Sequence, residues 1–160
     1  MLLLLGNETR SADVTTRTAP APCTRMTDMV AILNAHHGTT PGTDKDALVI
    51  VLQESLNCAQ CCTSCADACI ADPDVAHLGR AAGAALNCAD MTTAAVRVLS
   101  RPTAHDRAVT EAVLRAVIET CREGYEELRK HAAENEACMI CAEACRRCGQ
   151  ACRRLLASRD

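Results

Sequence analysis

Aromatic residues are nearly absent from this 160-residue chain, which has one tyrosine, Tyr125, and neither tryptophan nor phenylalanine. Any hydrophobic core must therefore be filled by aliphatic side chains, methionine and cysteine. The chain also lacks an apolar run of the roughly 20 residues that a membrane span requires. Its formal net charge of -3 offers no surplus of positive charge for nucleic acid or an anionic membrane. We therefore expect neither nucleic acid nor a membrane as partner.

The N-terminal segment lacks the features of an export signal. Its apolar run, Met1 to Leu5, is short, has no basic residues before it and is accompanied by no twin arginine. We predict a disordered segment over residues 1–25, with Met26 as a second candidate start, and we place Cys23 outside the functional core. The expected location is cytoplasmic, where cysteines remain free or metal-bound.

Beyond residue 25 the sequence predicts helices and no strands. A short amphipathic helix over 27–37 ends at Gly38 and is followed by a turn, and Thr43 and Thr103 are predicted to cap two of the later helices. Pro73 and Pro102 separate long helical patterns. These patterns cover about residues 44–71, 74–100, 103–132 and 134–158.

Four long helices with short connections predict an all-α fold, an antiparallel up-down-up-down four-helix bundle with a short extra N-terminal helix. The expected domain organisation is a disordered segment over 1–25, a short helix and turn over 26–43, and a cysteine-lined bundle over 44–158.

The chain is unusually rich in cysteine, with 13 residues. In the first and last bundle helices they recur at steps of three and four, the spacing that faces the centre of a bundle. The second and third helices supply Cys88 and Cys121, and the antiparallel order gathers all the thiols towards one end. Leucine, isoleucine and valine are predicted to close the opposite end: Leu48, Ile50, Val51, Leu52, Leu99, Val109, Val113, Leu155 and Leu156. The inward positions predicted around Cys121 are Leu114, Ile118, Tyr125 and Leu128.

A column of inward thiols suits Cu(I), a soft ion that prefers thiolate ligands. Cysteines three or four residues apart lie close enough to hold one small ion between them, so a ladder of them predicts multiple Cu(I) ions per chain. Two histidines, His77 and His131, are expected at the thiol-rich end and could pass copper inward. The predicted metal-binding residues are Cys58, Cys61, Cys62, Cys65, Cys69, Cys88, Cys121, Cys138, Cys141, Cys145, Cys148, Cys152, His77 and His131.

Other uses of these cysteines fit less well. Ladder neighbours on one helix are poorly aimed for disulfide geometry, and zinc sites usually draw four converging ligands from loops. A general sink for zinc or another thiophilic ion nevertheless stays open as the alternative. A thiol redox protein would need an exposed, activated thiolate that stands apart from the ladders. We predict that the chain is not an enzyme.

The run from Cys138 to Cys152 resembles the last helix of the bacterial four-helix-bundle copper storage proteins. The run from Cys58 to Cys69 resembles their first cysteine helix, and the stretch around Cys88 a piece of the second. The resemblance implies high-capacity Cu(I) storage, a homotetramer of bundles and copper uptake at one histidine- or methionine-bearing end. It points to the cytosolic branch, with a copper chaperone as a candidate partner. The chain departs from the richest members where Thr92, Leu114 and Ile118 stand in place of further thiols.

Overall fold

The protein is described here by a computed structural model that covers residues 25–36, 44–104 and 106–158. It contains five α-helices and one short 3₁₀ helix within these ranges, and no strand among the residues described. The bounds are α1 Arg25–Ala35, α2 Lys45–Ala71, α3 Val75–Leu99, η1 Pro102–Ala104, α4 Arg107–Leu128 and α5 Glu136–Ala157. The predicted disordered segment, Cys23, the turn after the first helix and His105 lie outside the described residues.

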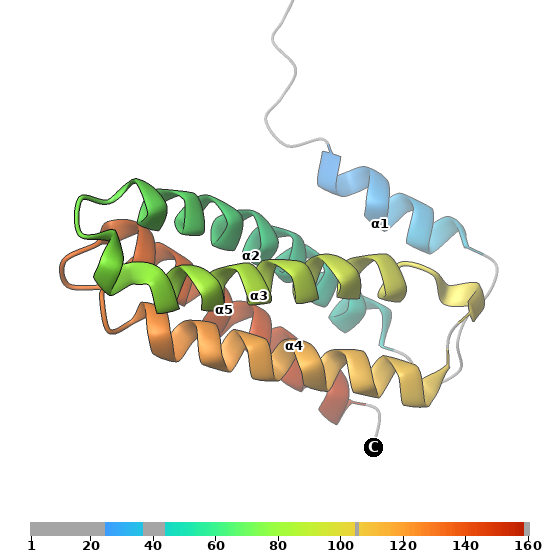
Figure 1. Cartoon of the computed structure of the whole chain (residues 1–160). Helices are drawn as coiled ribbons and strands as arrows, with labels where there is room; N and C mark the ends of the chain where they lie inside the picture. The colour runs from blue at the N-terminus through green and yellow to red at the C-terminus, as the bar shows by residue number, and fades with distance from the viewer. Residues whose placement is uncertain (1–24, 37–43, 105, 159–160) are drawn as a thin grey trace, which may run out of the picture.

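Helices α2 to α5 form the predicted antiparallel four-helix bundle (Figure 1). Each packs against two neighbours, α2 on α3, α3 on α4, α4 on α5 and α5 back on α2. The connections α2–α3 and α4–α5 lie at one end, on the left in Figure 1, and η1 lies at the other. The short helix α1 lies beside the bundle. No helix in the described part of the chain is long and apolar enough to cross a membrane.

Polar residues begin the bundle helices, although not always at the positions predicted. Asp44 accepts a hydrogen bond from the backbone N–H of Ala47 at 3.0 Å and so caps α2, whereas the predicted cap Thr43 lies outside the described residues. The predicted cap Thr103 is wrong, because it belongs to η1 and Asp106 caps α4 instead. Asn135 caps α5 by accepting from the N–H of Cys138.

The third bundle helix ends earlier than predicted, at Leu128 instead of about residue 132. After Leu128 the backbone closes into tighter three-residue turns, with the N–H of His131 donating to the carbonyl of Leu128 at 3.1 Å. This turn occupies residues 129–135 and lets α5 begin at Glu136, two residues later than predicted. The loop therefore contributes His131 to the end of the bundle where α2 meets α3.

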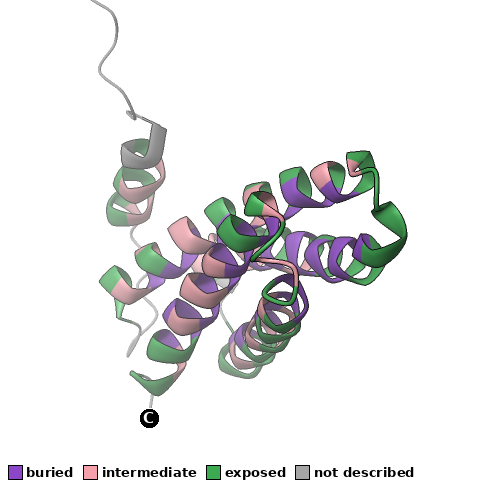
Figure 2. Cartoon of the chain, turned by 90° about the vertical axis from the view of Figure 1, so that its left-hand side faces the viewer, coloured by how far each residue is buried: buried purple, intermediate pink, exposed green. Residues whose placement is uncertain are grey.

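The core faces inward along all four helices, as the purple ribbon in Figure 2 shows. The predicted apolar closure is confirmed for Leu48, Val51, Leu52, Leu99 and Leu155, which are buried, while Val113 and Leu156 are partly buried. Two members were predicted wrongly: Ile50 is 47% exposed and Val109 is 51% exposed. Both lie next to an inward position, so the helical turn of about 100° per residue directs them outward.

On α4 the predicted inward residues Leu114 and Leu128 are buried, but the two inward positions nearest Cys121 are each displaced by one residue. Val117 and Gly124 are buried, whereas Ile118 and Tyr125 are only partly buried. Gly124 faces the core because the helices approach closely there. A Cβ atom added to it would lie 3.2 Å from the sulfur of Cys145, tighter than ordinary contact. The missing side chain therefore makes room for a thiol from α5.

Candidate metal centre

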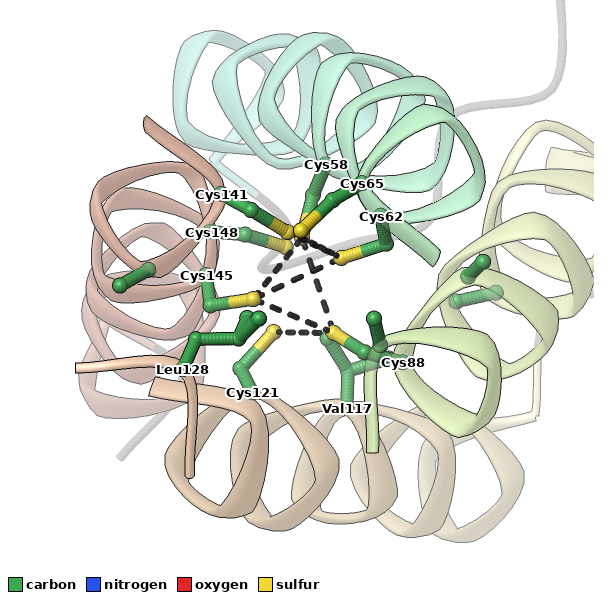
Figure 3. Close-up of a cluster of buried hydrophobic side chains, with 14 of the residues drawn as sticks. Cys58, Cys62, Cys65, Cys88, Val117, Cys121, Leu128, Cys141, Cys145 and Cys148 are labelled. Atoms are coloured by element: carbon green, nitrogen blue, oxygen red, sulfur yellow. Dashed lines mark hydrogen bonds between the residues drawn. The ribbon is translucent and has the colours of Figure 1, made fainter. Parts of the chain in front are cut away.

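The described cysteines line the centre of the bundle as free thiols. Those of α2 and α5 face one another, and Cys88 of α3 and Cys121 of α4 complete the ring (Figure 3). Eleven of these twelve cysteines are buried. The alternation of three- and four-residue steps on α2 and α5 brings this about, because it keeps all of their thiols except that of Cys61 on the face that points at the opposite helix.

The sulfur atoms touch in a continuous column that runs inward from the end where α2 joins α3. Nearest that end, the Sγ atoms of Cys69 and Cys138 are 3.7 Å apart. Further in, Cys62 lies 3.5 Å from Cys141 and 3.6 Å from Cys145. Because neighbouring sulfurs are this close, an ion that leaves one pair of thiols meets the next without crossing apolar packing.

Three groups of thiols within the column could each hold a metal ion, since the sulfurs within each lie within 4.8 Å of one another. One group has three cysteines near the α2–α3 connection, one has four from three helices, and one has three deeper in the bundle. They are Cys65, Cys69 and Cys138; Cys58, Cys62, Cys88 and Cys145; and Cys58, Cys121 and Cys148. Cys58 belongs to two of the groups and so joins them.

Cys61 does not lie with the other thiols. It is the one described cysteine that is only partly buried, and its Sγ lies 3.9 Å from the side-chain oxygen of Asn57. It lines a surface groove of 260 Å³ between α2 and α5, where Cys65 and Cys141 form part of the wall. The doublet Cys61–Cys62 therefore places one thiol in the core and the other at its edge, as a 100° step per residue requires.

Ser55 is a functional candidate that reasoning from the sequence missed. It is 1% exposed, and its hydroxyl lies 3.6 Å from the sulfur of Cys148. The steps from Ser55 to Cys58 and Cys62 are three and four, so the serine occupies the next position of the α2 ladder. This spacing could have identified Ser55 from the sequence, if serine had been considered as the oxygen analogue of cysteine.

His77 and His131 lie at the thiol-rich end, as the sequence predicted. Together with Asp72, Asp74, Leu78, Glu134 and Asn135 they line a hollow of 370 Å³. The side-chain amide of Asn135 donates to Asp72 at 3.3 Å and so ties the two connecting loops across this hollow. Neither histidine is among the three thiol groups. We refer to this hollow as the mouth.

The remaining described histidine lies elsewhere. His36 is hydrogen-bonded to Thr103 at 3.1 Å, at the opposite end of the bundle. It therefore has no place in the thiol column or at the mouth.

The surroundings of the thiols shift their pKa values. Burial raises the pKa of Cys69 and Cys138, and a hydrogen bond with Cys141 together with burial raises that of Cys65. The pKa of Cys88 is lowered instead, because its thiol is hydrogen-bonded to Cys121 and Cys145. A column made mostly of protonated thiols is uncharged, so it can pack as a hydrophobic core while empty.

Comparison with known proteins finds clear relatives. The family model described as copper storage protein matches residues 44–157. Ccsp from Streptomyces lividans, in a structure loaded with 10 copper equivalents, is 43% identical, covers 81% of this chain and 98% of its own, and has a TM-score of 0.80.

A second structure, of a cytosolic copper storage protein from the same organism loaded with five coppers, is 47% identical, covers 70% of this chain and 93% of its own, and has a TM-score of 0.69. A search of curated proteins finds no match.

Proposed function

Because the chain belongs to the copper storage protein family, we propose that it stores Cu(I) ions on the thiols that line its core. The single observation that carries this function is the column of buried sulfurs from Cys69 and Cys138 inward, in which contacting pairs lie 3.5–3.9 Å apart and each of the three groups lies within 4.8 Å. Soft thiolates select Cu(I) over hard cations. A relative is described as cytosolic, and we place this storage in the cytosol, where thiols stay reduced.

We propose as ligands the buried cysteines of the column, with Cys61 at its edge. Support for the buried set comes from the three groups of close sulfurs, and Cys141 and Cys152 extend them along α5. The mouth histidines, His77 and His131, would act in uptake. Storage needs no catalytic group, and we propose that the chain has no enzymatic role.

The partners other than copper are also proposals. Side chains such as Ile70, Val75 and Leu86 are apolar and 63%, 44% and 44% exposed, which supports assembly with further copies of the chain. A homotetramer, implied by the family resemblance, would cover such surface. A copper chaperone would deliver the metal at the mouth. Light scattering of the purified protein would give the number of chains directly.

Anaerobic titration with Cu(I) against a competing chelator tests the storage function. With 13 cysteines in the chain, we expect tight binding of about ten ions or more, because thiolates can be shared between soft ions. Saturation at one or two ions, or equal preference for zinc under competition, would show that the column is not a copper store.

Replacing both mouth histidines should slow copper uptake without lowering the amount bound. Imidazole binds copper but neither ring belongs to the thiol groups. We expect the double variant His77→Ala and His131→Ala to load severalfold more slowly in stopped-flow measurements and to reach the same final stoichiometry. His36→Ala, which alters a histidine at the far end, is the matched control. A fall in stoichiometry would make the histidines storage ligands instead.

Completing the α2 ladder should increase the capacity. Ser55 is buried 3.6 Å from Cys148, so Ser55→Cys would place another sulfur beside the deepest thiol group. We expect about one additional Cu(I) per chain in the chelator titration, at a cost in stability below about 1.5 kcal/mol for so small a change in volume. Ser55→Ala removes the hydroxyl without adding sulfur and should leave the capacity unchanged. Equal capacities for the two variants would contradict the expectation.

A further inference from the structure

We infer that Cys58, Cys62, Cys88 and Cys145 form a site for a single divalent zinc ion in tetrahedral coordination. This site takes one ion per chain, whereas the copper store takes many. These four thiols come from three helices, α2, α3 and α5, and converge on one point in the core (Figure 3). The sequence made zinc the less favoured metal, because zinc sites usually draw four converging ligands from loops and these thiols lie along helices. The fold removes that objection by bringing Cys88 and Cys145 to the pair on α2.

The spacing of the four sulfurs matches a zinc tetrahedron. With Zn–S bonds of about 2.3 Å, adjacent ligands of a regular tetrahedron are about 3.8 Å apart. From Cys58, the distances to Cys62, Cys88 and Cys145 are 3.8, 3.6 and 3.9 Å. Cys145 lies 3.6 Å from Cys62 and 3.8 Å from Cys88. The sixth pair, Cys62 and Cys88, is within 4.8 Å.

The four-thiol geometry distinguishes the zinc site from the sites for stored Cu(I). Four thiolates at tetrahedral positions favour zinc, a d¹⁰ ion that is almost always four-coordinate in closed protein sites. The other two groups have three thiols each and lack the fourth sulfur of a closed site. The four-thiol group therefore holds one divalent ion, and the two three-thiol groups hold none.

The charge of the filled site makes this zinc exchangeable. One Zn²⁺ with four thiolates carries a net charge of minus two, and four protons leave as it binds. The buried polar and charged residues of the described chain are Ser55, Thr92, Thr110 and Glu127, none of them a cation. A buried charge without a compensating partner is costly. We therefore expect zinc to bind when copper is scarce and to be displaced when Cu(I) arrives.

Cobalt(II) is the probe for the site, because tetrahedral coordination gives intense visible bands where octahedral coordination gives weak ones, and thiolate ligands add sulfur-to-cobalt charge-transfer bands in the near ultraviolet. Titration of the reduced, metal-free full chain with Co²⁺ should saturate at one ion per chain with these bands, and added Zn²⁺ should remove them. Cu(I) should then release the zinc to a colorimetric chelator. Absence of a one-to-one tetrahedral signal would overturn the inference.

Cysteine-to-alanine variants test which thiols bind the zinc ion. Cys88→Ala and Cys145→Ala should each weaken zinc binding by about 100-fold or more, since loss of merely an outer-shell partner costs 10–100-fold. Cys61→Ala and Cys138→Ala change thiols outside the four and should keep the cobalt spectrum. Equal losses in all four variants would overturn the site. The helical signal in circular dichroism checks that each variant is folded. If Cys88→Ala is unfolded, the effect on zinc binding is measured with Cys145→Ala.

The outcome is independent of the proposed storage function. A chain that takes up many Cu(I) ions but no tetrahedral cobalt would reject the zinc site and leave storage intact. A chain that binds one cobalt ion and only one or two copper ions would support the zinc site and reject storage.

Discussion

Raising the pH above about 9 is expected to unfold the metal-free protein and to leave the copper-loaded protein folded. In the fold, the pKa values of Cys65, Cys69 and Cys138 are raised above the ordinary value of 9.0. A raised pKa in the folded state means that the stabilisation is fully present below pH 9 and is lost as the pH rises towards the folded value. Each such thiol then costs about 1.4 kcal/mol per pH unit.

Several thiols acting together make this effect large. Three of them cost about 4 kcal/mol one unit above pH 9, a large part of the 5–15 kcal/mol typical of a folded domain. Copper-loaded thiols have already given up their protons, so loading should remove the dependence.

Circular dichroism followed from pH 7 to about 11, anaerobically and with reductant, measures the effect. We expect the helical signal of the metal-free protein to be lost in this range and that of the loaded protein to persist. The triple variant Cys65→Ala, Cys69→Ala and Cys138→Ala has fewer thiols to ionise and should lose stability less steeply. Full helicity of the metal-free wild type at the upper limit would refute the expectation.

The sequence predicted the bundle well because its strongest signals are local and periodic. The steps of three and four between Cys138 and Cys152 define a helix face by themselves, and that face is buried as expected. The prolines at 73 and 102 place the helix boundaries. The placement of the mouth follows from the alternating direction of the helices, which brings His77 and His131 to one end.

The parts that the sequence did not predict depend on contacts between helices. On α4 a single cysteine leaves the register open, and the choice of Val117 over Ile118 is made by packing against neighbouring helices. Gly124 carries no apolar signal, yet it faces the core because Cys145 fills the space beside it. The sequence did not predict the four-thiol group for the same reason, because its members come from three helices.

Removing Cys58 is expected to cost more copper capacity than removing any cysteine at the edge of the column. Its sulfur lies 3.6–3.9 Å from those of Cys62, Cys88 and Cys145, and it is the residue that joins two of the thiol groups. A thiolate shared between ions contributes to each of them. We therefore expect Cys58→Ala to lower the capacity by about two to three ions, measured by anaerobic Cu(I) titration against a chelator.

Cys61→Ala provides the matched comparison, because it removes a thiol from the same helix three residues away. Cys61 is only partly buried and belongs to none of the three groups, so its loss should cost at most about one ion, the number a single unshared thiol could help to hold. The contrast tests whether the column works as a connected array. If the two variants lost the same amount, each thiol would act alone, and the close contacts around Cys58 would reflect packing instead of shared coordination.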